Sequence, residues 1–242
     1  MPEVRFDEQV AATYDEDSRE MFEPSVLGPT VDLLAELAGH GPVLEFAVGT
    51  GRVALPLAQR GLAVSGIDVS EPMLARLRAK PGADALSLTT GDLPTGRVDG
   101  SFTLVYLVFN TIMNVTSQAE QVATFRNAAD HLAPRGRFVV EVGVPALRRL
   151  PPGESVRAFA LTPEHLGFDE YEVATQTLWS HHYRFGDGAA RVSSAPYRYV
   201  WPAELDLMAQ LAGLELRHRW ADWTRAPFTS DSTAHVSVWQ KP

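Results

Sequence analysis

A glycine-rich turn between two apolar segments is the first stretch of this sequence that could hold a ligand. Residues 43–54 read V-L-E-F-A-V-G-T-G-R-V-A, and Gly49 to Ala54 fit the pattern G-x-G-x-x-G/A. Such a turn, placed after a strand and before a helix, brings backbone N–H groups close to a bound nucleotide. The pattern predicts a nucleotide-binding loop, but its six letters do not identify the nucleotide.

Three carboxylates narrow the choice of ligand. Glu45 lies just before the turn, Asp68 follows the next apolar segment, and Asp92 follows the third. Asp68 stands near the ~20-residue spacing of an acid that binds ribose hydroxyls, although it could also cap the next turn. Glu45 would repel a pyrophosphate and attract an ammonium or sulfonium group. The three acids therefore favour an adenosine that carries positive charge, with Asp92 placed to accept from the adenine amino group.

The elements that must position these residues alternate between strand and helix. We expect strands at 43–46, 62–67, 85–89, 101–108 and 137–142, and helices at 26–37, 52–60, 72–80 and 118–132. This alternation predicts an α/β fold, a doubly wound, Rossmann-like, mostly parallel sheet with helices on both faces. Ligands of such sheets bind at the carboxyl ends of the strands, where the three acids lie.

The rhythm changes after Val144. Residues 145–167 are rich in Pro, Gly and Arg, and two β-like segments at 172–185 and 191–201 are joined by the hairpin signal Gly186-Asp187-Gly188. A helix at 202–211 and strands at 214–220 and 234–240 follow. We therefore expect a core of residues 1–144 and 201–242 with an N-terminal helical arm, and an inserted antiparallel β layer, residues 145–200, that covers the substrate.

The composition restricts the partners. Lys and Arg number 21 against 30 Asp and Glu, and a net charge of −9 disfavours nucleic acid. The chain has no cysteine, which excludes disulfides and thiolate chemistry, and no convincing metal-ligand spacing, so we expect no metal. No apolar run reaches the ~18 residues of a membrane span, and the acidic N-terminus lacks a secretion signal. We expect a cytoplasmic monomer or homodimer that acts on a small molecule.

The order of five segments resembles the class I S-adenosylmethionine-dependent methyltransferases. These segments are E-F-A-V-G-T-G, G-I-D-V-S-E-P-M-L, T-G-D-L, F-T-L-V-Y-L-V-F-N-T and L-A-P-R-G-R-F-V-V-E. The resemblance covers about residues 40–145, and the whole chain is similar to bacterial small-molecule methyltransferases such as the amino-sugar N-methyltransferases of antibiotic pathways. One departure is Ala47, where the family has its first loop glycine; alanine costs little there if its φ is negative.

The resemblance implies S-adenosylmethionine as cofactor, S-adenosylhomocysteine as product, and a set of binding residues. The methionine part would face Glu45, Ala47, Gly49 and Gly51, the ribose Asp68, the adenine Val69, Met73, Asp92 and Leu93, and the sulfonium Val108. Tyr14 resembles an aromatic residue that closes over the cofactor in many relatives. On pattern alone it could equally pack the arm onto the core.

The acceptor should lie beside the sulfonium, at the ends of the fourth and fifth strands. Phe109, Asn110 and Asn114 follow the fourth strand, and Glu141 lies at the end of the fifth. Methyl transfer needs alignment, exclusion of water and a deprotonated acceptor. Glu141 could hold an ammonium or orient a hydroxyl, or it could simply bond nearby backbone.

The inserted layer offers further aromatic and basic side chains. Period two places Trp179, His181 and Tyr183 on one face of a strand, and Tyr197, Tyr199 and Trp201 on one face of the next. Opposed across the hairpin, they would form an aromatic wall over the acceptor, or the same face could pack on the core. His181 or His182, which point to opposite sides, is a candidate general base, although an amine acceptor needs none.

The sequence thus predicts an enzyme that transfers a methyl group to a nitrogen or oxygen of a small organic molecule. One alternative is an NAD(P)-dependent oxidoreductase, which depends on the pattern at 49–54. The other is a non-catalytic domain that binds S-adenosylmethionine.

Overall fold

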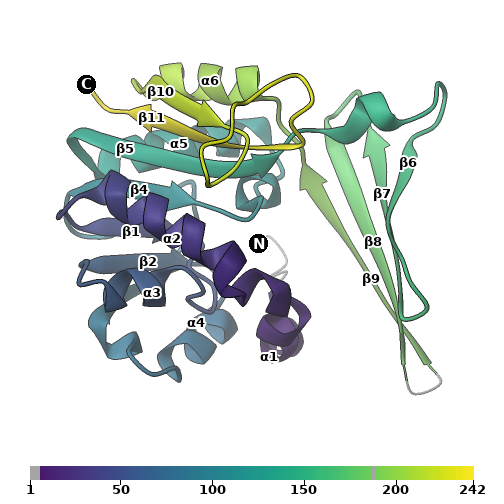
Figure 1. Cartoon of the computed structure of the whole chain (residues 1–242), viewed down its shortest axis with the longest axis horizontal. Coiled ribbons are helices and arrows are strands. Elements are labelled where there is room, and N and C mark those ends of the chain that lie inside the picture. Colours follow the sequence, from purple (N-terminus) through teal and green to yellow (C-terminus); the bar gives the residue numbers. More distant parts are fainter. Residues whose placement is uncertain (1–5, 187–188) are drawn as a thin grey trace.

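Two separate β-sheets form the framework of the protein (Figure 1). The computed structural model describes residues 6–186 and 189–242. The larger sheet has seven strands in the order β10-β11-β5-β4-β1-β2-β3, and the smaller has four in the order β6-β7-β8-β9. The larger sheet carries the glycine turn and the three acids. The smaller sheet stands beside the carboxyl ends of its parallel strands, where β5 leads into it (Figure 1).

The larger sheet is mostly parallel, which confirms the predicted fold class. Its parallel strands are β1 (Val43–Phe46), β2 (Val64–Asp68), β3 (Leu86–Thr90), β4 (Phe102–Leu107) and β5 (Leu132–Gly143). β11 (Ala234–Gln240) runs antiparallel between β5 and β10 (Glu215–Trp220). All four residues of β1 are buried, as expected for a central strand covered on both faces.

Helices cover both faces of this sheet and enclose two apolar clusters. They are α2 (Pro24–Ala38), α3 (Ala54–Gln59), α4 (Glu71–Arg78), α5 (Gln118–His131) and α6 (Pro202–Leu211), with the 3-10 turns η1 (Arg19–Phe22), η2 (Ala83–Ala85), η3 (Thr111–Asn114) and η4 (Ala146–Arg149). Phe46, Phe125 and Trp239 belong to one cluster, whereas Leu34 and Tyr106 belong to the other. The N-terminal arm is the helix α1 (Glu8–Asp17).

The smaller sheet is antiparallel and comes entirely from residues 156–198. Its strands are β6 (Val156–Leu161), β7 (His165–Glu172), β8 (Thr177–Gly186) and β9 (Ala189–Arg198). β6 and β7 lie in or next to the Pro-, Gly- and Arg-rich stretch where we expected no strand. A turn at 173–176, with Gln176 at φ 54°, separates β7 from β8. Of the predicted hairpin turn, Asp187 and Gly188 lie outside the described residues.

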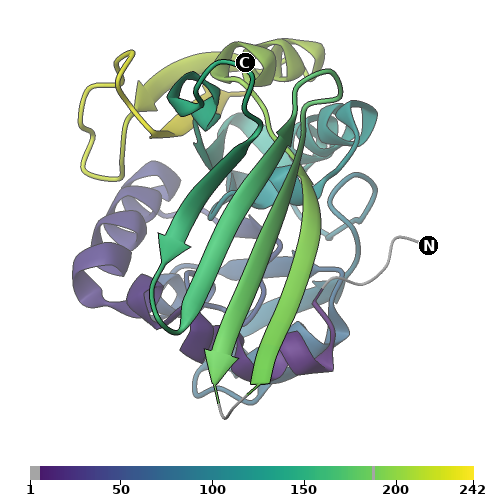
Figure 2. The ribbon, with the colours of Figure 1, turned by 90° about the vertical axis from the view of Figure 1, so that its right-hand side faces the viewer.

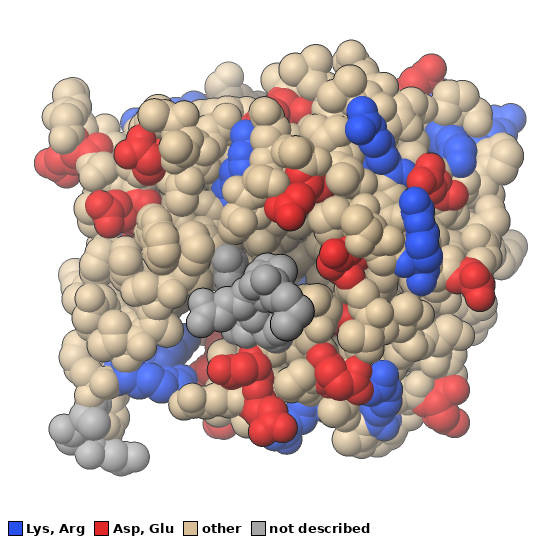
Figure 3. All heavy atoms as spheres, turned by 180° about the vertical axis from the view of Figure 1, so that it is seen from behind, with Lys and Arg blue, Asp and Glu red and all other residues tan. Residues whose placement is uncertain are grey.

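Figure 2 shows the smaller sheet lying across α1 and the neighbouring edge of the core. Arg191 of β9 forms an ion pair with Asp17 of α1, at 3.6 Å. On the face shown in Figure 3, Lys and Arg lie singly among Asp and Glu. None of the helices in the described part of the chain is long and apolar enough to cross a membrane.

Candidate active site

The glycine turn after β1 takes a left-handed backbone path. Gly49 and Gly51 have φ of 54° and 82°, and a side chain at Gly51 would clash with Leu77. Ala47 also has a positive φ, 56°, so the condition under which alanine would cost little there is not met. A non-glycine residue bears about 1 kcal/mol of strain in this region, and surrounding structure must hold it.

Asp68 at the end of β2 ties the turn to the next strand. One carboxylate oxygen accepts the N–H of Gly49 and the other that of Ser70, both at 2.8 Å. Burial raises the pKa of Asp68, and these backbone N–H groups oppose the shift. Because each carboxylate oxygen has two lone pairs, Asp68 can still accept ribose hydroxyls while it fixes the loop.

Glu45 is a buried acid beneath the same turn, only 3% exposed. The Tyr106 hydroxyl donates a hydrogen bond to its carboxylate at 2.9 Å. Burial raises the pKa of Glu45 to about 8, although Tyr106 and Arg52 both lower it. A bound cation would favour the ionised form, whereas a pyrophosphate would oppose it. The turn therefore suits a positively charged ligand.

The predicted adenine site has apolar surfaces and an acceptor. Val69 is 50% exposed at the tip of β2, whereas Met73 and Leu93 are buried. One oxygen of Asp92 accepts from the Thr95 N–H, the Thr95 hydroxyl and the Gly96 N–H. The described hydrogen bonds leave the other oxygen available. This combination fits a flat aromatic base with one amino group.

The arm helix α1 is fastened to the glycine turn. Thr50 donates its hydroxyl hydrogen to Asp15 at 2.6 Å, and Lys80 forms an ion pair with Asp15 at 2.5 Å. Tyr14 on the same helix has a pKa raised chiefly by burial, and Arg52 and Asp68 also act on it electrostatically. The structure therefore brings Tyr14 to the predicted cofactor site.

Arg52 is a cation that the sequence analysis passed over. Its guanidinium lies over the Phe109 ring, 5.1 Å from the centroid, and it acts electrostatically on Glu45. Arg52 directly follows Gly51, so its place in the turn was the available signal. The turn thus offers an anion, Glu45, and a cation, Arg52. These two charges can bind the ammonium and the carboxylate of an amino-acid group.

The loop after β4 is held in an unusual conformation by Glu141. Phe109 and Asn110 both have φ of 59°. The Glu141 carboxylate accepts the Phe109 N–H at 2.8 Å, and Asn110 in turn accepts the Gly143 N–H at 2.6 Å. Glu141 therefore bonds nearby backbone, which is one of the two roles expected of it, and positions Phe109. Val108 is buried beside this loop, and Asn114 ends the following turn η3.

The strand register corrects the predicted aromatic wall. Trp179, His181 and Tyr183 pair with Pro196, Ser194 and Val192, whereas Tyr197 pairs with Leu178. Because directly paired residues share a face, Tyr197 lies on the face opposite Tyr183. The Tyr197 face carries the buried Tyr171 and Leu178, which pack with Tyr199, Leu147 and Leu150 near the core. Trp179 on the other face is 43% exposed.

The two candidate histidines therefore have different surroundings. His181 lies on the outward face, stacks on Phe168 and is hydrogen-bonded to Ser194 at 2.7 Å. His182 lies on the core-facing side, where its ring nitrogen is 3.0 Å from that of His165 and burial lowers its pKa. The structure thus directs His181 and Tyr183 away from the core. Tyr199, 2% exposed, is a packing residue.

Known proteins share both the sequence and the fold of this chain. The family described as "Methyltransferase domain" matches residues 43–136. The cypemycin N-terminal methyltransferase of Streptomyces sp is 29% identical, covering 95% of this chain and 98% of its own. The CcbJ methyltransferase from Streptomyces caelestis is 37% identical over 89% of each chain, with a TM-score of 0.81. SAM-bound CalS10, an amino pentose methyltransferase from Micromonospora echinaspora, shares the fold at 19% identity and covers 95% of this chain and 96% of its own, with a TM-score of 0.72.

Proposed function

The chain belongs to the S-adenosylmethionine-dependent methyltransferases, and from this premise we propose that it methylates an amine nitrogen of a small organic molecule. We choose nitrogen because each of the three predicted general bases either has another partner or points away from the core. Glu141 is engaged by the Phe109 N–H, His182 is paired with His165, and His181 faces outward. A hydroxyl acceptor needs a base to remove its proton, whereas a neutral amine supplies its own lone pair. The name of the cypemycin N-terminal methyltransferase supports the same choice.

The charges around the glycine turn fit each end of the cofactor. Glu45 would face its ammonium group and Arg52 its carboxylate, while Asp68 would accept the ribose hydroxyls and Asp92 the adenine amino group. When bound, the cofactor supplies a methyl group on a positively charged sulfur. The same charges disfavour the alternative of an NAD(P)-dependent oxidoreductase, because Glu45 lies beneath the turn that would have to hold a pyrophosphate.

The protein's contribution to the reaction would be alignment and exclusion of water. Phe109, held by Glu141, and the buried Val108 would form the wall beside the reacting carbon. The acceptor nitrogen would form the new N–C bond as the C–S bond breaks, with the bonding pair passing to sulfur. The surplus proton would then leave the new ammonium for water. Such alignment accounts for much of the rate in displacement reactions of this kind.

A library of acceptors tests the proposal. The full chain is incubated with trideuteromethyl S-adenosylmethionine and matched amines and phenols, and products are identified by mass spectrometry. We expect labelled methyl groups on amines and none on phenols. Labelled phenols alone would contradict the choice of nitrogen. Silence with every acceptor, while S-adenosylhomocysteine still binds in calorimetry, would favour a non-catalytic binding domain.

A further inference from the structure

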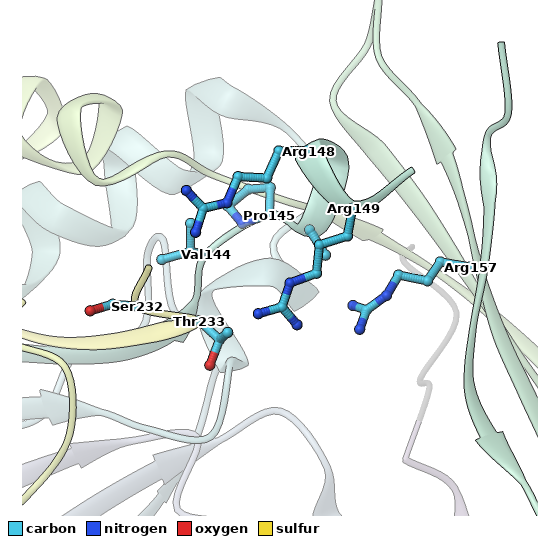
Figure 4. A pocket seen from close by; sticks show the side chains of 8 residues that line it. Val144, Pro145, Arg148, Arg149, Arg157, Ser232 and Thr233 are labelled. Atoms are coloured by element: carbon cyan, nitrogen blue, oxygen red, sulfur yellow. The ribbon is translucent and has the colours of Figure 1, made fainter. Parts of the chain in front are cut away.

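Two arginines, one from each side, extend into the gap between the core and the smaller sheet. Arg149 ends the turn η4, and Arg157 lies in β6. Figure 4 shows both guanidinium groups extending into the same gap, whereas Arg148 points away. Arg148 pairs with Asp231 at 3.5 Å, but neither Arg149 nor Arg157 has an ion pair among the described residues.

The surroundings of these arginines are basic and hydroxylic. They line a small pocket of about 70 Å³ together with Val144, Pro145, Ala146, Arg148, Ser232 and Thr233. No Asp or Glu is among these lining residues, in a chain whose net charge is −9. Asp169 pairs with Arg157 across the strands, and its carboxylate is hydrogen-bonded to Ser180 and interacts electrostatically with Arg157. Asp169 therefore offsets part of the Arg157 charge from outside the pocket, whereas no carboxylate lines the pocket itself.

Two positive charges in one pocket repel each other. An anion bound between them would attract both and offset this repulsion. The planar guanidinium matches the oxygens of a carboxylate or phosphate and can bind them in a bidentate manner. The hydroxyl group of Thr233 adds a neutral donor at the same pocket. The chemistry of the pocket is thus that of an oxyanion site.

The pocket adjoins the acceptor side of the active site. Its wall begins at Val144, directly after Gly143, whose N–H is bonded to Asn110 of the loop that carries Phe109. An oxyanion in the pocket would therefore lie near the end of β5, where the loop that carries Phe109 is bonded. The other wall comes from β6 of the smaller sheet, so binding would join the two parts of the protein.

We propose that the acceptor is an anionic amine, whose carboxylate or phosphate binds Arg149 and Arg157 while its nitrogen reaches the methyl group. This assignment rests on the proposed methyl transfer and adds the chemical class of the substrate. The oxyanion site itself is independent of that activity, so binding and turnover can be tested apart.

The first test measures binding of inorganic phosphate. Arginine Nε–Hε resonances of the full chain are followed by NMR during titration, with Arg149→Gln and Arg157→Gln used for assignment. We expect saturable shifts of both resonances, and loss of the Arg149 shift in Arg157→Gln. Arg126→Gln, which removes the same charge from the exposed surface of α5, should leave both shifts unchanged. Unshifted Arg149 and Arg157 resonances in the folded wild type would overturn the site.

The second test compares acceptors that differ only in charge. Amines that bear a carboxylate or a phosphate are paired with their neutral methyl esters, and kcat/KM is measured for each. We expect a preference of at least about tenfold for an anionic acceptor, which is the size of one lost charge-assisted hydrogen bond. Arg149→Gln and Arg157→Gln should reduce this preference mainly through KM, without changing the affinity for S-adenosylhomocysteine.

The outcomes separate the two proposals. Equal kcat/KM for acids and esters in the wild type would overturn the anionic substrate and leave methyl transfer to amines intact. Phosphate binding without methylation of any amine would overturn the proposed function and leave the oxyanion site. A preference for phosphates over carboxylates, or the reverse, identifies which oxyanion the arginines recognise and supports the inference.

Discussion

Replacing Glu45 with Gln should make the free protein more stable and its complex weaker. Burial raises the pKa of Glu45 from 4.5 to about 8, so the ionised carboxyl is disfavoured in the folded chain. The preference of the folded chain for the protonated Glu45 carboxyl therefore adds fully to the free energy of unfolding below pH 4.5. This contribution is lost as the pH rises toward 8. At pH 7 the ionisation of Glu45 in the unfolded chain has lowered the free energy of unfolding by about 3 kcal/mol relative to its value below pH 4.5.

Urea unfolding of both proteins without cofactor measures this term. Glutamine keeps an oxygen for the Tyr106 hydroxyl but has no proton to lose. The advantage of Glu45→Gln in free energy of unfolding should therefore grow by about 3 kcal/mol between pH 5 and pH 8. It should level off above the folded pKa, because both states of the wild type are then ionised.

For cofactor binding we expect Glu45→Gln to be unfavourable, in contrast to its favourable effect on the free energy of unfolding. At pH 7 only about a tenth of Glu45 is ionised in the free protein, and a bound ammonium would ionise the rest, so binding should release nearly one proton. The affinity of the wild type should rise about ninefold from pH 6 to pH 7, and that of Glu45→Gln should not. Calorimetry in buffers of different ionisation enthalpy counts the proton.

Two results would refute this reasoning. A stability difference that stays constant from pH 5 to pH 8 would mean that Glu45 is already ionised in the free protein. Cofactor binding without proton release, in a wild type whose stability does vary as expected, would mean that no cation reaches Glu45. The first result concerns the burial of the acid, and the second concerns the position of the ligand.

Three further predictions test other parts of the site. Asp68→Ala should weaken S-adenosylhomocysteine binding in calorimetry at least about tenfold more than Glu141→Ala, because it removes a charged acceptor and the anchor of the loop; equal losses would show that cofactor and acceptor roles are mixed up. His182→Ala should change turnover and His181→Ala should leave it near wild type, since only His182 faces the core; matching effects would contradict the strand register. Ala47→Gly should raise the free energy of unfolding by about 1 kcal/mol in urea, and a loss of stability would show that φ there is not strained.

The central strands of the parallel core were predictable because β1, β2 and β4 are buried almost throughout. Apolar residues marked these strands, whereas β3 is only partly buried, and the acids Glu45, Asp68 and Asp92 stood out by type. β6 was not predictable in this way, because most of its side chains are exposed and it shows no alternation of apolar residues. The Pro-, Gly- and Arg-rich composition of that stretch indicated a loop instead.

Local sequence patterns also could not give the register in which neighbouring strands pair. Period two correctly places His181 and His182 on opposite faces of β8, but it does not say which residue of β9 lies opposite. A shift of one residue puts Pro196 rather than Tyr197 beside Trp179. In the same way, nothing local indicated that Ala47 takes a left-handed conformation, which the hydrogen-bonded turn imposes.

The smaller sheet is one uninterrupted stretch of chain that leaves the core after β5 and returns before α6. Its two ends meet, since Leu147 and Leu150 pack with Tyr199. The acids of the glycine turn and the strands that carry them all come from elsewhere in the chain. Evolution or an engineer can therefore exchange this stretch as a single cassette. Under the proposed function, such an exchange would alter the acceptor side of the protein and leave the proposed binding residues for the methyl donor in place.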